Sequence, residues 1–224
     1  MTKNRIALLA LAAALLIATT VAATLLITGA DEETSIGKAA PRNGDAGLPP
    51  LKDGRILAAN EWPDACTLVD LEDVKAILPD AKDIQQQQRR VYAPSIEDFA
   101  ADPAQKESDS ADSGQCDYDM RLPGEKYRAT HFWIRIDAVA HPKLIAGYYK
   151  KVAPGANIKK TNGADLCAIN SLSEGSWTCR KGSLMFTVGG QTTTTFDGQS
   201  DAAPFVWRDQ VAPQFVRTVT AKVR

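Results

Sequence analysis

The sequence has little of the chemistry that makes an enzyme recognisable. Its 224 residues include two histidines and four cysteines, with no GxSxG pattern, no CxxC pair and no closely spaced histidines. These absences argue against a serine hydrolase with a nucleophile elbow, a zinc site and a thioredoxin-like redox pair. A nucleophile–histidine–carboxylate arrangement can still assemble from distant parts of a chain, so the missing motifs do not exclude one.

An excess of charge of one sign is also missing. The chain has 26 basic and 27 acidic residues, which gives a formal net charge of −1. Without the two positive charges of Lys3 and Arg5, which lie at the N-terminus, the remainder carries −3. This balance provides no basic surface for nucleic acid or anionic lipid. We therefore expect no nucleic-acid partner.

Patterns that hold metals or phosphate groups are absent as well. In the acidic stretch that begins at Asp109, Ala111 and Met120 stand where an EF-hand loop requires oxygen ligands. Gly189 and Gly190 lack the spacing of a dinucleotide fingerprint or a P-loop. The sequence thus predicts no metal and no cofactor.

One long apolar run is present, at residues 6–28, and it contains no charged residue. A helix of about 20 apolar residues crosses a bilayer, and basic residues before it stay in the cytoplasm. Residues 1–30 are therefore predicted to be a transmembrane anchor or uncleaved signal, with the rest outside a cell membrane crossed once. The alternative is a signal peptide cleaved near Ala30, followed by secretion, but the run is longer than a signal peptide needs.

Residues 31–62 change abruptly to turn-forming chemistry, rich in proline, glycine and alanine. This composition predicts a flexible linker between the membrane and the domain. Four apolar residues leave open the alternative that the segment lies on the domain instead. They are Leu48, Leu51, Ile56 and Leu57.

Residues 63–224 are predicted to form one α+β domain, an antiparallel sheet flanked by helices. Apolar residues at helical spacing follow Asp70 and Pro142, and a third helical stripe near the C-terminus is interrupted by Pro213, where we expect a kink. Strands are expected at residues 116–122, 131–137, 165–170, 176–180 and 183–188. Residues 84–92 are ambiguous between a water-facing strand and a continuing helix, and the strand is favoured. The acidic stretch 93–115 is predicted to be a long exposed loop, with one helical turn near Ile96 and Phe99.

The alternation in residues 116–122 and 131–137 predicts an antiparallel hairpin with one apolar and one polar face. A sheet face with an aromatic residue and mixed charges is a candidate binding face, unless a helix covers it and makes the tryptophan part of the core. The six residues of this predicted face are Asp117, Asp119, Arg121, His131, Trp133 and Arg135.

Four cysteines in an exported domain predict two disulfides. Cys167 and Cys179 lie at equal distances from Ser173, the centre of a predicted turn, so a hairpin would place them opposite each other. Cys66 would then pair with Cys116.

Three short motifs of the domain occur together: Asp64-Ala65-Cys66-Thr67-Leu68-Val69 before a helix, Cys116-Asp117-Tyr118 at the start of a strand, and a later Cys-to-Cys hairpin before the last helix. In this combination they resemble an uncharacterised actinobacterial family of exported, often lipoprotein-anchored domains. The resemblance covers about residues 63–224 and implies a compartment and a fold class but no activity. This chain departs from the family because no cysteine follows its apolar run.

Two functions follow as hypotheses. The first is a membrane-tethered, extracytoplasmic, non-enzymatic domain that binds a cell-envelope ligand or a protein partner. The second is an exported hydrolase in which His131 works with a surface carboxylate, Asp117 or Asp119. The missing catalytic motifs favour the first.

Overall fold

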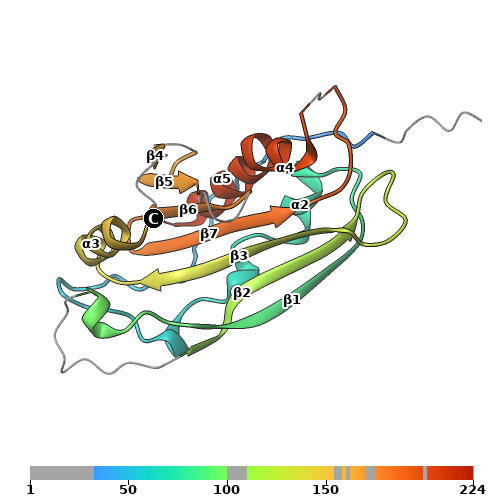
Figure 1. Ribbon diagram of the computed structural model, residues 1–224. Helices are drawn as coiled ribbons and strands as arrows, with labels where there is room; N and C mark the ends of the chain where they lie inside the picture. The colour runs from blue at the N-terminus through green and yellow to red at the C-terminus, as the bar shows by residue number, and fades with distance from the viewer. Residues whose placement is uncertain are drawn as a thin grey trace, which may run out of the picture. The chain divides into compact units, whose positions relative to one another are not determined.

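An antiparallel sheet of seven strands runs through the residues that the computed structural model describes, which are 33–99, 110–153, 158–159, 162–169, 175–198 and 201–223 (Figure 1). The strand order is β1-β2-β3-β7-β6-β5-β4, and every neighbouring pair is antiparallel. The strands are β1 (Lys82–Tyr92), β2 (Ser110–Arg121), β3 (Thr130–Val139), β4 (Ile158–Lys159), β5 (Leu166–Ile169), β6 (Trp177–Lys181) and β7 (Leu184–Gln191). This sheet with its helices confirms the α+β class.

The helices pack mainly on one face of the sheet, with α2 and α5 on that side (Figure 1). The α-helices are α2 (Leu71–Ile77), α3 (Pro142–Val152), α4 (Ala203–Val206) and α5 (Ala212–Lys222). A π-helical turn, η4 (Trp207–Val211), joins α4 to α5, and the short 3-10 turns are η1 (Ala59–Glu61), η2 (Ala65–Thr67) and η3 (Ile96–Phe99). In contrast to α5, α3 packs on the opposite face, beside Ala168 and Met185.

The local sequence explains where these helices begin. Asp70 caps α2, and its side chain and that of Asp73 form a reciprocal capping box. Near the C-terminus, the predicted interruption at Pro213 is confirmed: the π turn precedes it, and Pro213 lies in the first turn of α5. Ala212 N–H donates to Trp207 O, five residues earlier, and Pro213, which has no N–H to donate, follows directly after this π turn.

The core between the sheet and α5 is rich in aromatic side chains. The rings of Tyr118 and Phe132 stack with centroids 4.3 Å apart, and Phe132 lies 4.4 Å from Phe215 on α5. Trp207 closes the cluster and is fully buried. Its indole lies against Gly190, where a Cβ atom would come within 2.2 Å of the ring.

Residues 33–62 lie along the domain, in contrast to the predicted flexible linker. Hydrogen bonds between backbones attach this segment at Thr34 to Thr195, at Ala46 to Lys222 and at Leu57 to Val139. The sequence left open whether four apolar residues of this segment pack on the domain. They do contact its two hydrophobic clusters: Leu48, Leu51, Ile56 and Leu57. The compact unit therefore begins near Glu33 rather than at Pro63. Backbone hydrogen bonds hold residues 33–62 on the domain, and the composition of this segment gave no sign of them.

The acidic stretch is partly strand. The predicted helical turn is present as η3, but β2 already begins at Ser110, where an exposed loop was expected. Gly114 explains part of this difference, because a Cβ at that position would lie 2.2 Å from Val91 on the neighbouring strand. Close pairing of β1 with β2 therefore needs glycine at position 114, although glycine in a sequence often indicates a turn.

The predicted membrane span, residues 6–28, lies outside the described residues. Among the helices that the structure does describe, none has the length and hydropathy to cross a membrane.

Candidate functional site

The predicted face is assembled by the pairing of β2 with β3. Asp119 lies opposite His131, and Asp117 lies opposite Trp133. Gln115 pairs with Arg135, and Arg121 shares the face because side chains alternate along a strand. All six residues predicted from the sequence thus lie on one side of the hairpin, opposite the aromatic core.

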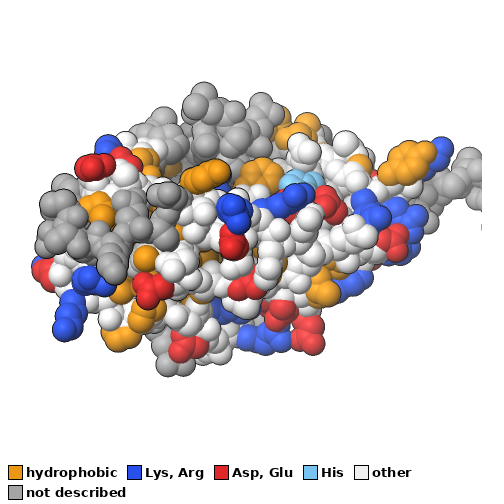
Figure 2. All heavy atoms as spheres, turned by 90° about the horizontal axis from the view of Figure 1, so that it is seen from below, with side chains coloured by type: hydrophobic (Ala, Val, Ile, Leu, Met, Phe, Trp, Pro, Cys, Tyr) orange, Lys and Arg blue, Asp and Glu red, His pale blue; other side chains and the backbone are white. Residues whose placement is uncertain are grey.

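The charges on this face are paired with one another. His131 Nδ1 lies 2.9 Å from Asp119 Oδ1, and Arg121 lies 3.1 Å from Asp83 on β1. Asp117 accepts hydrogen bonds from Arg89 Nε at 3.1 Å and from the amide of Gln115 at 2.6 Å. Figure 2 shows basic and acidic side chains interspersed on the side of the molecule that it views, with hydrophobic atoms in small separate spots.

Trp133 is half-buried because it lies over the backbone of β7. A Cβ on Gly189 would come within 2.2 Å of Cζ2 of this indole, so the ring depends on glycine at that position. The His131 ring lies beside it, with centroids 5.6 Å apart. Each of the two adjacent glycines of β7 therefore has a tryptophan indole against it, Trp133 on this face and Trp207 in the core.

A cavity of about 580 Å³ opens at the end of this face, between the sheet, α3 and the chain that leaves β1. Arg135 belongs both to the predicted face and to the cavity. The other lining residues are Arg90, Val91, Tyr92, Ala93, Pro94, Gln115, Ile136, Asp137, Tyr148, Val152, Thr178, Met185 and Thr187.

A hydrogen-bonded network forms the floor of the cavity. Arg135 Nε donates to Asp137 Oδ1 at 2.7 Å, and the Thr187 hydroxyl donates to Oδ2 at 2.6 Å. The Thr187 and Thr178 hydroxyls lie 3.1 Å apart. Burial raises the pKa of Asp137, and the Arg135 charge and the Thr187 hydrogen bond offset only part of that effect.

Sequence patterns predicted only some of the residues of this network. Asp137 follows the alternation of the polar face, but it sits where the β3–β7 register shifts between Ile136 and Ala138. A bulge of this kind re-aims a side chain. Thr187 joins the site because β3 pairs with β7, and no sequence signal indicated that pairing. Thr178 joins it through the β6–β7 hairpin, whose turn at Lys181 and Gly182 is visible in the sequence.

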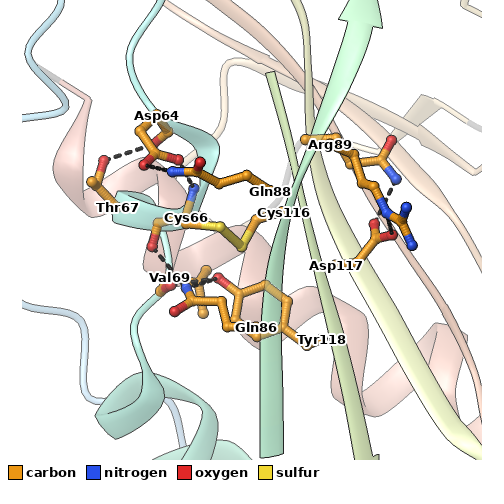
Figure 3. The surroundings of a disulfide bond; sticks show 11 residues. Asp64, Cys66, Thr67, Val69, Gln86, Gln88, Arg89, Cys116, Asp117 and Tyr118 are labelled. Carbon is orange, nitrogen blue, oxygen red and sulfur yellow. Dashed lines mark hydrogen bonds and ion pairs between the residues drawn. A yellow bond between two sulfur atoms is a disulfide. The ribbon is translucent and has the colours of Figure 1, made fainter. Parts of the chain in front are cut away.

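Both predicted disulfides are present, Cys66–Cys116 and Cys167–Cys179, and no cysteine is free. Figure 3 shows the first bridge beside Asp64 and Tyr118, whose hydroxyl donates to Val69 O at 2.5 Å. In the same view, the Arg89–Asp117 pair projects from the opposite side of the strands. The bridge therefore belongs to the core side of the sheet and not to the candidate face.

A larger cavity of about 1010 Å³ lies between residues 35–38, η4 and α5. The Gln214 side chain accepts a hydrogen bond from Ala39 N at 2.6 Å and donates one to Gly37 O at 2.9 Å. The Trp177 indole donates to Arg208 O at 2.7 Å. Because these polar groups fasten protein segments to each other, the smaller cavity at Arg135 is the better candidate.

The chemistry available on the candidate face is limited. His131 and Asp119 form a pair, but the cross-strand neighbours of His131 are Asp119 and Gln191, neither of which is a serine, threonine or cysteine that a histidine base would activate. Throughout the described part of the chain, no three histidine, cysteine, aspartate or glutamate side chains cluster in a way that could hold a metal ion. The face thus offers a histidine–carboxylate pair, further ion pairs and an aromatic ring.

Comparison with known proteins adds no relative: no family model, no curated protein and no solved structure matches this chain.

Proposed function

We propose that this chain is an extracytoplasmic, membrane-tethered and non-enzymatic domain that binds a cell-envelope ligand or a protein partner. Its binding surface is the sheet face that carries Trp133 and Arg135. The observation that carries the proposal is the cavity at Arg135, which continues a face of charged side chains and a half-buried aromatic ring. Concave sites with a few convergent polar groups are where proteins usually bind small molecules.

The compartment rests on other features. The apolar run at residues 6–28 supports a single membrane span with the domain outside. Two disulfides support an oxidising compartment, because such bonds are rare in the cytosol. The actinobacterial resemblance fits this location and adds no activity.

Native mass spectrometry of the oxidised full-length chain, released from detergent, tests the proposal. We expect an extra mass that denaturant removes, or a partner that crosslinks in cells. Either should be lost in a variant with alanine at both Trp133 and Arg135. Tyr127→Ala is the matched control, because Tyr127 is an exposed aromatic residue outside the face. A large loss of thermal stability in the double variant would contradict a binding surface and make Trp133 a core residue.

The hydrolase alternative keeps one supporting observation, the 2.9 Å contact between His131 and Asp119. Asp117 is engaged by Arg89 instead. Ester hydrolysis that disappears when Asp117 and Asp119 are both changed to asparagine would favour this alternative. Absence of hydrolysis, together with a retained ligand, would favour binding.

A further inference from the structure

The arginine in the cavity has most of its hydrogen-bonding capacity free. A guanidinium group carries five N–H donors, and Arg135 uses Nε to bind Asp137. Within the described residues, neither Nη group of Arg135 has a protein acceptor. The side chain is 44% exposed. Asp137 therefore fixes the plane of the guanidinium while its outer edge remains available.

Both arginines of the cavity are paired with a carboxylate. Of the described residues that line the cavity, Arg90 and Arg135 are basic and Asp137 is acidic; Arg135 binds Asp137, and Arg90 binds Asp112 at 2.6 Å. Both carboxylate oxygens of Asp137 are occupied, one by Arg135 and the other by the Thr187 hydroxyl. The feature that favours an oxyanion is therefore the unbonded outer edge of the Arg135 guanidinium and not a net positive charge.

Apolar side chains also line the same cavity. Among the described residues, five large hydrophobic side chains are exposed, and two of them line this cavity: Tyr92 at 81% and Val152 at 43%. Tyr148, Met185 and Pro94 add further apolar surface. This arrangement is independent of the arginine and suits a ligand with a hydrophobic body.

We propose that the cavity at Arg135 binds a small organic anion with an aromatic or aliphatic body. A carboxylate or phosphate group would lie on the free edge of the Arg135 guanidinium, which matches such oxyanions in geometry. The body would lie between Tyr148, Tyr92 and Val152. A volume of about 580 Å³ suits a small molecule. This inference rests on the proposed function and names its ligand class.

Titration calorimetry with the oxidised full-length chain in detergent tests the inference. The probes are 4-phenylbutyrate and phenyl phosphate, with 4-phenylbutanamide as the neutral counterpart of the acid. We expect at least one anion to bind and the amide to bind about tenfold more weakly than its acid. Binding of either anion supports the proposal, and the tighter one identifies the preferred group.

Arg135→Gln should weaken binding of the anion about tenfold, whereas Arg89→Gln should change it less than about twofold. Arg89 is a close control because it lies in the same cross-strand row and on the same face, and its Nε also binds an aspartate. It does not line the cavity. Equal effects of the two variants would overturn the assignment to Arg135.

A second pair of variants avoids any risk to folding. Val152 is exposed at the end of α3, so Val152→Glu and Val152→Gln differ only in the charge at the mouth. The glutamate should weaken anion binding several-fold relative to the glutamine and leave the amide unaffected.

The outcomes separate this inference from the proposed function. Equal binding of acid and amide would refute anion recognition and leave a binding domain. No binding of any probe, together with a ligand retained in mass spectrometry, would refute the inference alone. No probe binding, no retained mass and no crosslinked partner would refute both.

Discussion

The indole of Trp133 lies against the backbone of Gly189, and the next residue, Gly190, receives the indole of Trp207 from the other side of the sheet. Alanine at either position would place a Cβ 2.2 Å from a ring carbon. The two glycines therefore form a matched pair, one below a half-buried ring and one below a fully buried ring.

Gly190→Ala should destabilise the domain by about 1–3 kcal/mol, because Trp207 is enclosed by the core and cannot move aside. Gly189→Ala should cost less than about 1 kcal/mol, because Trp133 can turn toward solvent. Urea unfolding of both variants measures the difference. A larger loss at Gly189 than at Gly190 would show that Trp133 is the more confined ring.

The ammonium group of Lys222, near the end of α5, lies 3.1 Å from a carboxylate oxygen of Asp73 at the start of α2. Both side chains are nearly buried, with 11% and 3% exposed. Lys222→Met should destabilise the domain by about 2 kcal/mol, because it leaves the buried carboxylate with only half-exposed Arg42, 3.3 Å away, as a charged partner among the described residues.

Lys151→Met is the control for that variant. Lys151 also forms an ion pair, with Asp98, but this pair is exposed. Its loss should cost less than about 1 kcal/mol in the same unfolding experiment. Similar losses of unfolding free energy in the two lysine variants would mean that burial of the Lys222–Asp73 pair does not increase its contribution to stability.

Much of the fold follows from local patterns in the sequence. The alternation in β2 and β3 predicted the hairpin and its polar face, and Asp70 marked the start of α2. The cysteine positions predicted both bridges, because a hairpin centred on Ser173 places Cys167 opposite Cys179. Except for Cys66–Cys116, which spans 50 residues and followed by elimination, the deciding interaction lies within one element or between neighbouring elements of the chain.

The cavity could not be predicted in the same way. It depends on the pairing of β3 with β7, which brings Thr187 opposite Arg135 across 52 residues, and on a register shift at Asp137. Neither leaves a periodic signal. The attachment of residues 33–62 was also hidden, because hydrogen bonds from backbone groups such as Thr34 N are invisible in composition.

The two disulfides should differ in their contribution to stability. Cys66–Cys116 spans 50 residues and Cys167–Cys179 spans 12. The chain-entropy model credits them with about 4 and about 3 kcal/mol, respectively. Each bridge can be removed by changing both of its cysteines to serine, and the two variants compared by urea unfolding without reductant. Removal of Cys66–Cys116 should lower the unfolding free energy by about 1 kcal/mol more than removal of Cys167–Cys179. The reverse order would mean that native contacts around the hairpin bridge outweigh loop length.

Asp137 predicts a dependence of stability on pH. Burial raises the pKa of this carboxyl above its ordinary value of 3.8. The folded state therefore holds the proton more tightly than the unfolded state. The resulting stability is fully present below the unfolded pKa and is lost as the pH rises through the folded pKa.

Asp137→Asn cannot ionise, so the unfolding free energy of the parent should fall relative to that of the variant as the pH rises from about 4 toward neutrality. Urea unfolding across this range measures the gap. Asp98→Asn is the control of opposite sign, because Lys151 and Ser95 lower the pKa of Asp98. That carboxylate contributes stability above its unfolded pKa and loses it as the pH falls. A gap for Asp137→Asn that stays constant, or that moves in the direction of the Asp98 control, would show that the Arg135 charge outweighs burial and that the carboxylate on the cavity floor stays ionised.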